Sequence, residues 1–227
     1  PHEGPTGEAR REAGRRLAEA LAAVLESRRA GSPLLLAIPM GGVQVAYEVA
    51  VHLGVPGTEL SILVARKLPF PENPESGFGA VAEDGSTVLL REFANRIPEP
   101  LIQRIVAEQR QEIARRIRVL RGGGPLPEME SRTVILIDDG IAMGSTMQAA
   151  IRLCKKRKSG ALLVAVPVSS RDTKRRLSWI VDQAVVLETP RDFRAVADAY
   201  EHWYDVPDHE ATELFERWRR QRESQPP

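Results

Sequence analysis

The chain is most informative at Val134-Ile-Leu-Ile-Asp138-Asp139-Gly140-Ile-Ala142-Met143-Gly144-Ser145-Thr146. Its first four residues are apolar without alternation, which is typical of a parallel strand buried on both faces. Two carboxylates follow, then a turn punctuated by glycines, and then helical spacing over 145–156. A strand that leads through a turn into a helix is the repeating unit of α/β proteins. This stretch therefore predicts a parallel sheet with helices on both faces.

The rest of the chain continues the alternation. Short apolar runs bounded by turn residues predict strands at 34–38, 60–65, 133–137, 161–168 and 184–187. Amphipathic spacing predicts helices at 8–29, 43–53, 99–120, 145–156 and 171–180. Together they indicate a doubly wound, mainly parallel sheet of five strands. Asp84-Gly85 predicts a hairpin turn, which adds an antiparallel strand.

The last forty residues differ from the rest of the chain. Residues 189–207 are irregular and rich in aromatic side chains, whereas 208–222 regain helical spacing. No domain-sized linker interrupts the sequence, so we expect one domain over 1–227.

Composition excludes several classes of function. The net charge is +1, so we expect neither nucleic acid nor a membrane surface as a partner. The apolar runs are far shorter than the roughly 20 residues that a membrane span needs, and no secretion signal is evident. Cys154 is the single cysteine, so we expect a reducing compartment, the cytoplasm. The sequence contains no P-loop, no GxSxG elbow and no ligand spacing of a zinc site.

The opening stretch also predicts a ligand. In open parallel sheets, ligands bind outside the carboxyl ends of the strands. The glycines and the helix start at Ser145 suit a phosphate. Asp138 and Asp139 would repel that phosphate, so they suit adjacent hydroxyl groups or a divalent cation. A sugar phosphate with vicinal hydroxyls meets both demands, although an aspartate pair alone also fits a metal-holding strand of an ATPase or an ordinary strand end.

The same stretch resembles the diphosphosugar-binding signature of type I phosphoribosyltransferases. Two other segments carry the resemblance further. Ile38-Pro-Met40-Gly41-Gly42 resembles the pyrophosphate loop of that family, and Arg66-Lys67 with the Pro-rich segment 68–78 resembles its flexible catalytic loop. The run from about 34 to 205 is similar to an uncharacterised branch of the family, whose pattern appears here as Arg66-Lys67, Asn73-Pro74-Glu75 and Gly79-Ala80-Val81-Ala82-Glu83.

The resemblance implies a function and a role for each matching residue. The donor would be phosphoribosyl pyrophosphate, and the acceptor a nitrogenous base or amine. Asp138 and Asp139 would hold the ribose hydroxyls, directly or through Mg²⁺. The 5-phosphate would be cradled by Ala142, Met143, Gly144, Ser145 and Thr146. The pyrophosphate would be bound by Met40, Gly41, Gly42, Lys67 and Arg66.

Other implied features concern the acceptor and the assembly. Residues 189–207 would form a hood over the base, where an aromatic such as Phe193 stacks; a small satellite core is the plainer interpretation of those aromatics. Residues 68–78 would form a lid, and family members commonly form homodimers.

Three departures from the family pattern bear on activity. Met40 stands where this branch usually has an arginine, and Met143 replaces a usual threonine. Ala142 stands where 6-oxopurine enzymes carry an aspartate that contacts the purine, which argues against hypoxanthine or guanine as acceptor. Two alternatives stay open: a sensor or regulator that keeps the pocket without turnover, and a phosphatase-like or nucleotide-hydrolysing protein that uses Asp138 and Asp139 as metal ligands.

Overall fold

The fold is described from a computed structural model, which places residues 5–200 and 204–224. Five parallel strands form the main sheet in the order β2-β1-β6-β7-β8. Their bounds are β1 Leu34–Ala37, β2 Glu59–Ile62, β6 Val134–Ile137, β7 Leu162–Val168 and β8 Gln183–Glu188. Each strand overlaps a predicted one, although β2 ends at Ile62, before the predicted residue 65, and the predicted parallel α/β sheet is confirmed.

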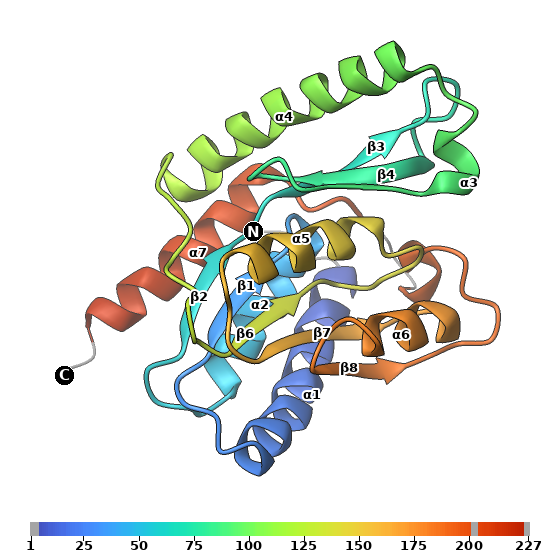
Figure 1. Ribbon diagram of the computed structural model, residues 1–227. Coiled ribbons are helices and arrows are strands. Elements are labelled where there is room, and N and C mark those ends of the chain that lie inside the picture. Colours follow the sequence, from blue (N-terminus) through green and yellow to red (C-terminus); the bar gives the residue numbers. More distant parts are fainter. Residues whose placement is uncertain (1–4, 201–203, 225–227) are drawn as a thin grey trace.

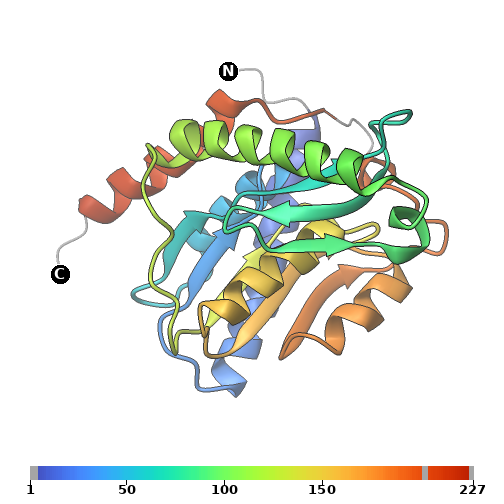
Figure 2. The same cartoon turned by 45° about the horizontal axis from the view of Figure 1, so that its top comes forward.

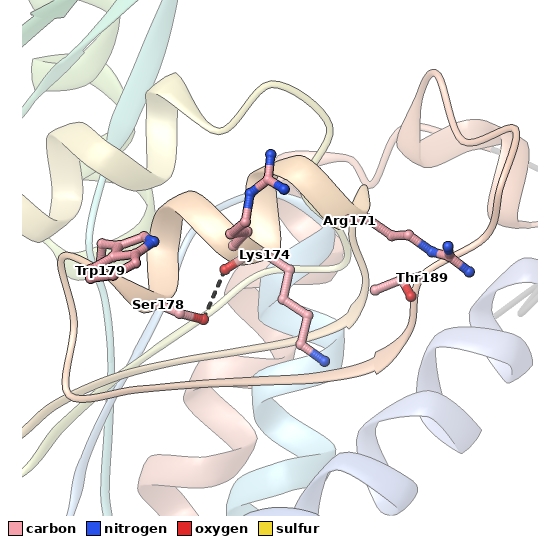
Figure 3. Close-up of a pocket in the computed structure, with 6 residues that line it drawn as sticks. Arg171, Lys174, Ser178, Trp179 and Thr189 are labelled. Atoms are coloured by element: carbon pink, nitrogen blue, oxygen red, sulfur yellow. Dashed lines mark hydrogen bonds between the residues drawn. The ribbon is translucent and has the colours of Figure 1, made fainter.

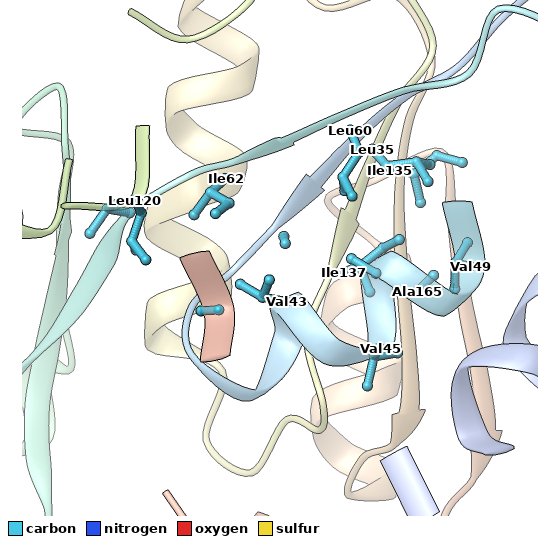
Figure 4. Packing of buried hydrophobic residues seen from close by; sticks show 14 of the residues in the cluster. Leu35, Val43, Val45, Val49, Leu60, Ile62, Leu120, Ile135, Ile137 and Ala165 are labelled. Carbon is cyan, nitrogen blue, oxygen red and sulfur yellow. The ribbon is translucent and has the colours of Figure 1, made fainter. Parts of the chain in front are cut away.

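Helices cover both faces of this sheet, as expected (Figure 1). One face packs against α1 Pro5–Ser27, α2 Gly41–His52 and α7 Asp208–Glu223, and the other against α5 Ser145–Lys156 and α6 Arg171–Ser178. Strand side chains alternate between the two cores, because successive residues of a strand point to opposite faces. In Figure 4, Val43 and Val49 of α2 lie beside Ile137 and Ala165 of the sheet.

A second, antiparallel sheet lies between α5 and α4 Glu99–Arg121 (Figures 1 and 2). It consists of β3 Ala65–Pro69, β4 Gly77–Ala82 and β5 Thr87–Leu89. A short helix, α3 Arg91–Ala94, leads from it into α4. Leu68 and Phe78 join the core that α4 shares, whereas Ala80 and Ala82 join the core around α5.

This second sheet corrects two details of the sequence prediction. The hairpin at Asp84-Gly85 is present, but its strands belong to the separate three-stranded sheet rather than adding one strand to the main sheet. The expected lid begins later than residue 68, because β3 continues to Pro69. Pro69 is tolerated there because β3 is an edge strand, where a missing N–H breaks no ladder.

The topology singles out one edge of the main sheet for a ligand. From β1 the chain passes through α2 to β2 on one side, and from β6 it passes through α5 to β7 on the other side. β1 and β6 are direct neighbours, with Ala37 opposite Ile137. Their carboxyl ends therefore flank the point at which the strand order reverses, which is where open α/β sheets bind ligands.

The C-terminal part contains a helix where the sequence predicted one, at 208–222. The hood, residues 189–207, contains a short 3-10 helix, Val196–Ala199, and Trp203 lies outside the described residues. Helix α7 begins at Asp208, whose carboxylate accepts a hydrogen bond from Arg115 of α4 at 2.7 Å. Within the described residues, every helix is too short or too polar to span a lipid bilayer.

Candidate functional site

Asp138 and Asp139 directly follow β6 at the carboxyl edge of the main sheet. Asp139 is only 6% exposed, whereas Asp138 is half-buried. The backbone N–H of Asp139 donates to Asp138 Oδ1 at 2.8 Å. Burial, followed by the neighbouring Asp139 carboxylate, raises the pKa of Asp138; burial also raises the pKa of Asp139. A cation or a hydroxyl donor that reached the pair would relieve this electrostatic cost.

Arg10 of α1 is a buried counterion of the pair, and the sequence interpretation missed it. Its side chain is fully buried, and its Nε donates to Asp139 Oδ2 at 3.1 Å, which opposes the rise in the pKa of that carboxyl group. The guanidinium carbon also lies 5.3 and 5.1 Å from the ring centroids of Tyr200 and Tyr204. The sequence did indicate that Arg10 is buried, because it lies seven residues before Leu17 and so continues the apolar stripe of α1.

The turn between β1 and α2 presses against the carboxylates. A Cβ atom on Gly41 would lie 1.8 Å from Asp139 Oδ2, and one on Gly42 would lie 2.9 Å from the carbonyl oxygen of Ile137. Only glycine fits these positions without a shift of the neighbours. Because α2 begins at Gly41, its first amides and the positive end of its dipole lie next to the pair. The Met40 side chain packs against the hydrophobic core, so it brings no charge to this turn.

The β6–α5 turn, residues 140–144, leads into a second helix start. Gly144 has a φ of +83°, which favours glycine, and α5 begins at the next residue. Thr173 Oγ1 donates to the Ala142 carbonyl at 2.6 Å, and Arg176 Nη2 donates to the Met143 carbonyl at 2.9 Å. These bonds turn two carbonyls that would repel an anion toward α6. The first amides of α5 lack intrahelical partners, as at anion-binding helix starts.

Ser145 and Thr146 open α5 beneath the small sheet. Ser145 is buried, and its Oγ donates to the Gly79 carbonyl at a long 3.4 Å. A Cβ atom on Gly79 would lie 2.2 Å from the Val88 carbonyl oxygen, so β4 needs glycine where it packs beside β5. Thr146 is half-buried. The β6–α5 turn is therefore attached to the hairpin that carries Lys67.

Arg66 and Lys67 lie on opposite faces of β3. Arg66 Nε donates to Gln109 Oε1 of α4 at 3.0 Å, so its side chain points away from the carboxylate pair. Lys67 lies on the other face, because side chains alternate along a strand; its cross-strand partner Ala80 packs in the core around α5. Lys67 is exposed, and its Nζ donates to the Glu75 carbonyl in the tip of the β3–β4 hairpin.

The hood closes over the same edge of the sheet. The buried hydroxyl of Tyr200 donates to the Asp139 carbonyl at 2.7 Å. A Cβ atom on Gly140 would lie 2.7 Å from Val196 Cγ1, so the hood packs directly on this turn. Phe193 is half-buried and lines a cavity of about 470 Å³ beside the turn. Tyr200 thus supports the backbone of the pair, while Phe193 lies at an opening.

Most of the predicted site residues gather at one edge of the main sheet. These are Met40, Gly41, Gly42, Asp138, Asp139, Ala142, Met143, Gly144, Ser145 and Thr146. Lys67 and Phe193 lie on elements that border this edge, whereas Arg66 faces α4. Within residues 5–200 and 204–224, no group of three or more His, Cys, Asp or Glu side chains is placed to hold a metal by itself.

The order of strands and the glycine-rich turns around a carboxylate pair are those of a phosphoribosyltransferase-like α/β protein. The chain belongs to the phosphoribosyl transferase family: the pattern described as "Phosphoribosyl transferase domain" matches residues 8–200. The crystal structure of TT1426 from Thermus thermophilus is similar, with 35% identity, a TM-score of 0.73, and coverage of 92% of this chain and 97% of that one.

Two curated relatives come from strains of Mycobacterium tuberculosis. They are named "Putative phosphoribosyl transferase Rv0571c" and "Putative phosphoribosyl transferase MT0597". Each is 33% identical over 210 residues, which cover 92% of this chain and 46% of the relative. The chain therefore spans about half the length of these relatives.

Proposed function

We propose that this protein transfers the 5-phosphoribosyl group from phosphoribosyl pyrophosphate to a nitrogenous acceptor and releases pyrophosphate. The observation that carries the proposal is the position of two helix starts, α2 at Gly41 and α5 at Ser145, on either side of Asp138 and Asp139. A helix start attracts anions, and a carboxylate attracts hydroxyl groups. A sugar with a phosphate at one end, a pyrophosphate at the other and hydroxyls between them matches this order of charges.

Each part of the donor then has a partner. The 5-phosphate lies at the first turn of α5, against the amides of 144–146 and the Thr146 hydroxyl. The ribose hydroxyls meet the carboxylate pair, and the half-buried Asp138 is the more accessible of the two. The pyrophosphate lies at the start of α2, where the absence of side chains on Gly41 and Gly42 lets the backbone approach.

Mg²⁺ fits this arrangement as an ion shared with the donor. The ion commonly takes one or two carboxylates together with substrate phosphates, and the edge offers two carboxylates. Asp139 already faces Arg10, so Asp138 would be the main protein ligand. When bound, Mg²⁺ neutralises charge on the pyrophosphate and so favours its departure.

The transfer itself depends on position and charge. The bond between C1 of the ribose and the pyrophosphate oxygen breaks, its electron pair leaves with pyrophosphate, and the acceptor nitrogen bonds to C1. Positive charge builds on the ribose, next to Asp138, while the amides of α2 and the Lys67 ammonium stabilise the departing anion. The β3–β4 hairpin tip, residues 70–76, is the segment that closes over the donor and excludes water.

Pyrophosphate release tests the proposal. The protein is incubated with phosphoribosyl pyrophosphate, Mg²⁺ and a panel of nucleobases and related heterocycles, and released pyrophosphate is measured. We expect release that depends on one class of acceptor, reduced about 100-fold or more by Asp138→Asn. Glu26→Gln, which removes one exposed carboxylate from α1, is the control and leaves the rate unchanged.

Two other outcomes have a clear meaning. Donor binding without release under any condition would support the sensor or regulator alternative, because the pocket would then act without turnover. If the protein neither bound the donor nor released pyrophosphate, the proposal as a whole would be contradicted.

A further inference from the structure

The cavity of about 470 Å³ beside the β6–α5 turn is built from three segments. Ala142 and Met143 form the wall that it shares with the turn, the first residues of α6 form a second wall, and Phe193 and Arg194 of the hood form a third. Because Ala142 and Met143 lie between the carboxylate pair and the start of α5, the cavity adjoins the space that a ribose 5-phosphate would occupy.

The lining separates into an apolar part and a cationic part. Ala142, Met143 and the half-buried Phe193 offer apolar surface, and Met143 is 45% exposed. A flat ring fits against such a wall, since aromatic and thioether groups stack on rings favourably. The β6–α5 turn itself brings no charged side chain to the cavity.

The charged lining is positive. Arg175, Arg176 and Arg194 line the cavity together with one carboxylate, that of Asp172. Arg176 donates a hydrogen bond to the Met143 carbonyl, so its positive charge lies at the edge of the turn. Arg175 Nη2 lies 2.9 Å from Asp172 Oδ1, but both side chains are more than 70% exposed, so the pair is easily exchanged for another anion.

We propose that the acceptor is an anionic nitrogen heterocycle, such as a ring carboxylate, whose ring lies on Met143 and Phe193 and whose anionic group faces Arg175 and Arg194. This inference rests on the proposed function. In the transfer, a ring nitrogen bonds to C1 of the ribose while the bond from C1 to pyrophosphate breaks. The electron pair leaves with pyrophosphate. An N–H acceptor then loses its proton to solvent, whereas a pyridine-type nitrogen carries no proton and becomes cationic in the product.

The other side of α6 supplies a control. A second hollow of about 730 Å³ is lined by Arg171, Lys174, Arg175, Ser178, Trp179 and Thr189, and Figure 3 shows this lining around α6 and the end of β8. Arg175 borders both hollows, whereas Arg171 borders only this one. Arg171 is exposed and is not among the residues that line the cavity beside the turn. Arg171→Gln therefore removes one positive charge from the same helix without changing the proposed acceptor cavity.

Calorimetry with matched mononucleotides tests the inference. Orotidine 5′-phosphate is compared with uridine 5′-phosphate, and nicotinate mononucleotide with nicotinamide mononucleotide, so that within each pair one member carries an added negative charge. Ribose 5-phosphate is the reference ligand. We expect at least one carboxylate-bearing member to bind about tenfold more tightly than its partner, as one charge-assisted hydrogen bond provides. The double variant Arg175→Gln/Arg194→Gln abolishes this preference, whereas Arg171→Gln keeps it.

Each contrary result is distinct. Binding of ribose 5-phosphate without any preference for a carboxylate, or weaker binding of every mononucleotide than of ribose 5-phosphate, overturns the inference and leaves the proposed function standing. The inference is also overturned if the double variant loses as much affinity for ribose 5-phosphate as for the carboxylate-bearing mononucleotide, because the arginines would then bind the phosphate. A loss of preference in Arg171→Gln would overturn it as well, since the effect would then belong to the general field of α6. No binding of ribose 5-phosphate at all would overturn both.

Discussion

Two buried arginine–carboxylate pairs stand at different places in this molecule, and they are built differently. Arg121, at the end of α4, binds both oxygens of Glu83 at 2.7 and 2.9 Å, with side chains 5% and 8% exposed. Glu83 also accepts the Val64 N–H at 2.8 Å, and Arg121 also donates to the Ile62 carbonyl. The charges of this pair balance, and each group has partners on several sides. It joins the small sheet, β2 and α4.

The pair at the candidate site is not balanced. Arg10 binds one oxygen of Asp139, and a second carboxylate, Asp138, lies next to it. Among the described residues, Arg10 is thus the one cation bonded to these two acidic groups, and burial raises the pKa of both carboxyls. The Arg121–Glu83 pair, whose charges balance, stabilises the fold. The carboxylates beside Arg10 carry an excess negative charge that a ligand can neutralise, which is common at functional sites.

The largest expected effect on stability belongs to the scaffold pair. Arg121→Met leaves the buried Glu83 without its counterion and should lower the free energy of unfolding by about 3–5 kcal/mol. Urea denaturation measures the change. Arg132→Met is the control, because Arg132 pairs with Glu59 at a more exposed position, where a loss of at most about 1 kcal/mol is expected. Equal losses in the two variants would contradict the comparison.

Removal of Arg10 should cost less, and its cost should depend on pH. Arg10→Met leaves the buried Asp139 and the half-buried Asp138 without this counterion, so that the pKa of each carboxyl rises further above the value of about 3.9 in the unfolded chain. A carboxyl group whose pKa is higher in the folded than in the unfolded protein favours folding only while it is protonated. The free energy of unfolding therefore falls as the pH rises through the folded-state pKa. We therefore expect a loss of about 2–3 kcal/mol at pH 8 and a clearly smaller one at pH 5. Chemical denaturation at both pH values measures it, and a loss independent of pH would contradict this account.

Asp138→Asn should act in the opposite direction. Because burial and Asp139 raise the pKa of Asp138, ionisation of this carboxyl opposes folding above that pKa. The amide removes that cost, and we expect a gain of about 1 kcal/mol at pH 7.5. Thermal unfolding measures the gain, which should disappear near pH 3, below the pKa of about 3.9 in the unfolded chain, where the carboxyl is protonated in both states. A loss of stability at pH 7.5 would show that Asp138 serves the fold rather than the site.

The smallest effect on stability is expected at Lys67. Among the described residues, its exposed side chain is hydrogen-bonded only to the hairpin tip. Lys67→Ala should therefore change the free energy of unfolding by less than about 0.5 kcal/mol. Turnover, measured by pyrophosphate release, should nevertheless fall about tenfold or more. Arg66→Ala is the matched control and should spare turnover, because Arg66 faces α4. A larger fall in turnover for Arg66→Ala than for Lys67→Ala would contradict the assignment of these side chains to opposite faces of β3.

Local sequence determined most of the fold. Apolar runs such as 134–137 and the spacing over 145–156 depend only on neighbouring residues, and the structure places the predicted strand and helix there. β3 was missed in part because its Pro-rich surroundings are typical of a loop, whereas an edge strand tolerates proline. Without that strand, the opposite faces of Arg66 and Lys67 could not be predicted.

The site was predictable where it is continuous in sequence. The two glycine-rich turns and the carboxylates lie within short stretches, and the parallel pairing of β1 with β6 brings them together. Arg10 is 129 residues from Asp139, and only the packing of α1 brings it to the pair. An arginine in an apolar stripe was the signal, but its partner depends on tertiary structure.

Calorimetric titration with phosphoribosyl pyrophosphate and Mg²⁺ tests most directly whether the unbalanced carboxylate pair between two helix starts binds the donor. The wild-type protein should show saturable binding. Asp138→Asn should lose it, and Gly41→Ala should weaken it, because a Cβ atom there would lie 1.8 Å from Asp139 Oδ2. Glu26→Gln should bind like the wild type. No heat with the wild-type protein, or equal binding by all of these variants, would contradict the account.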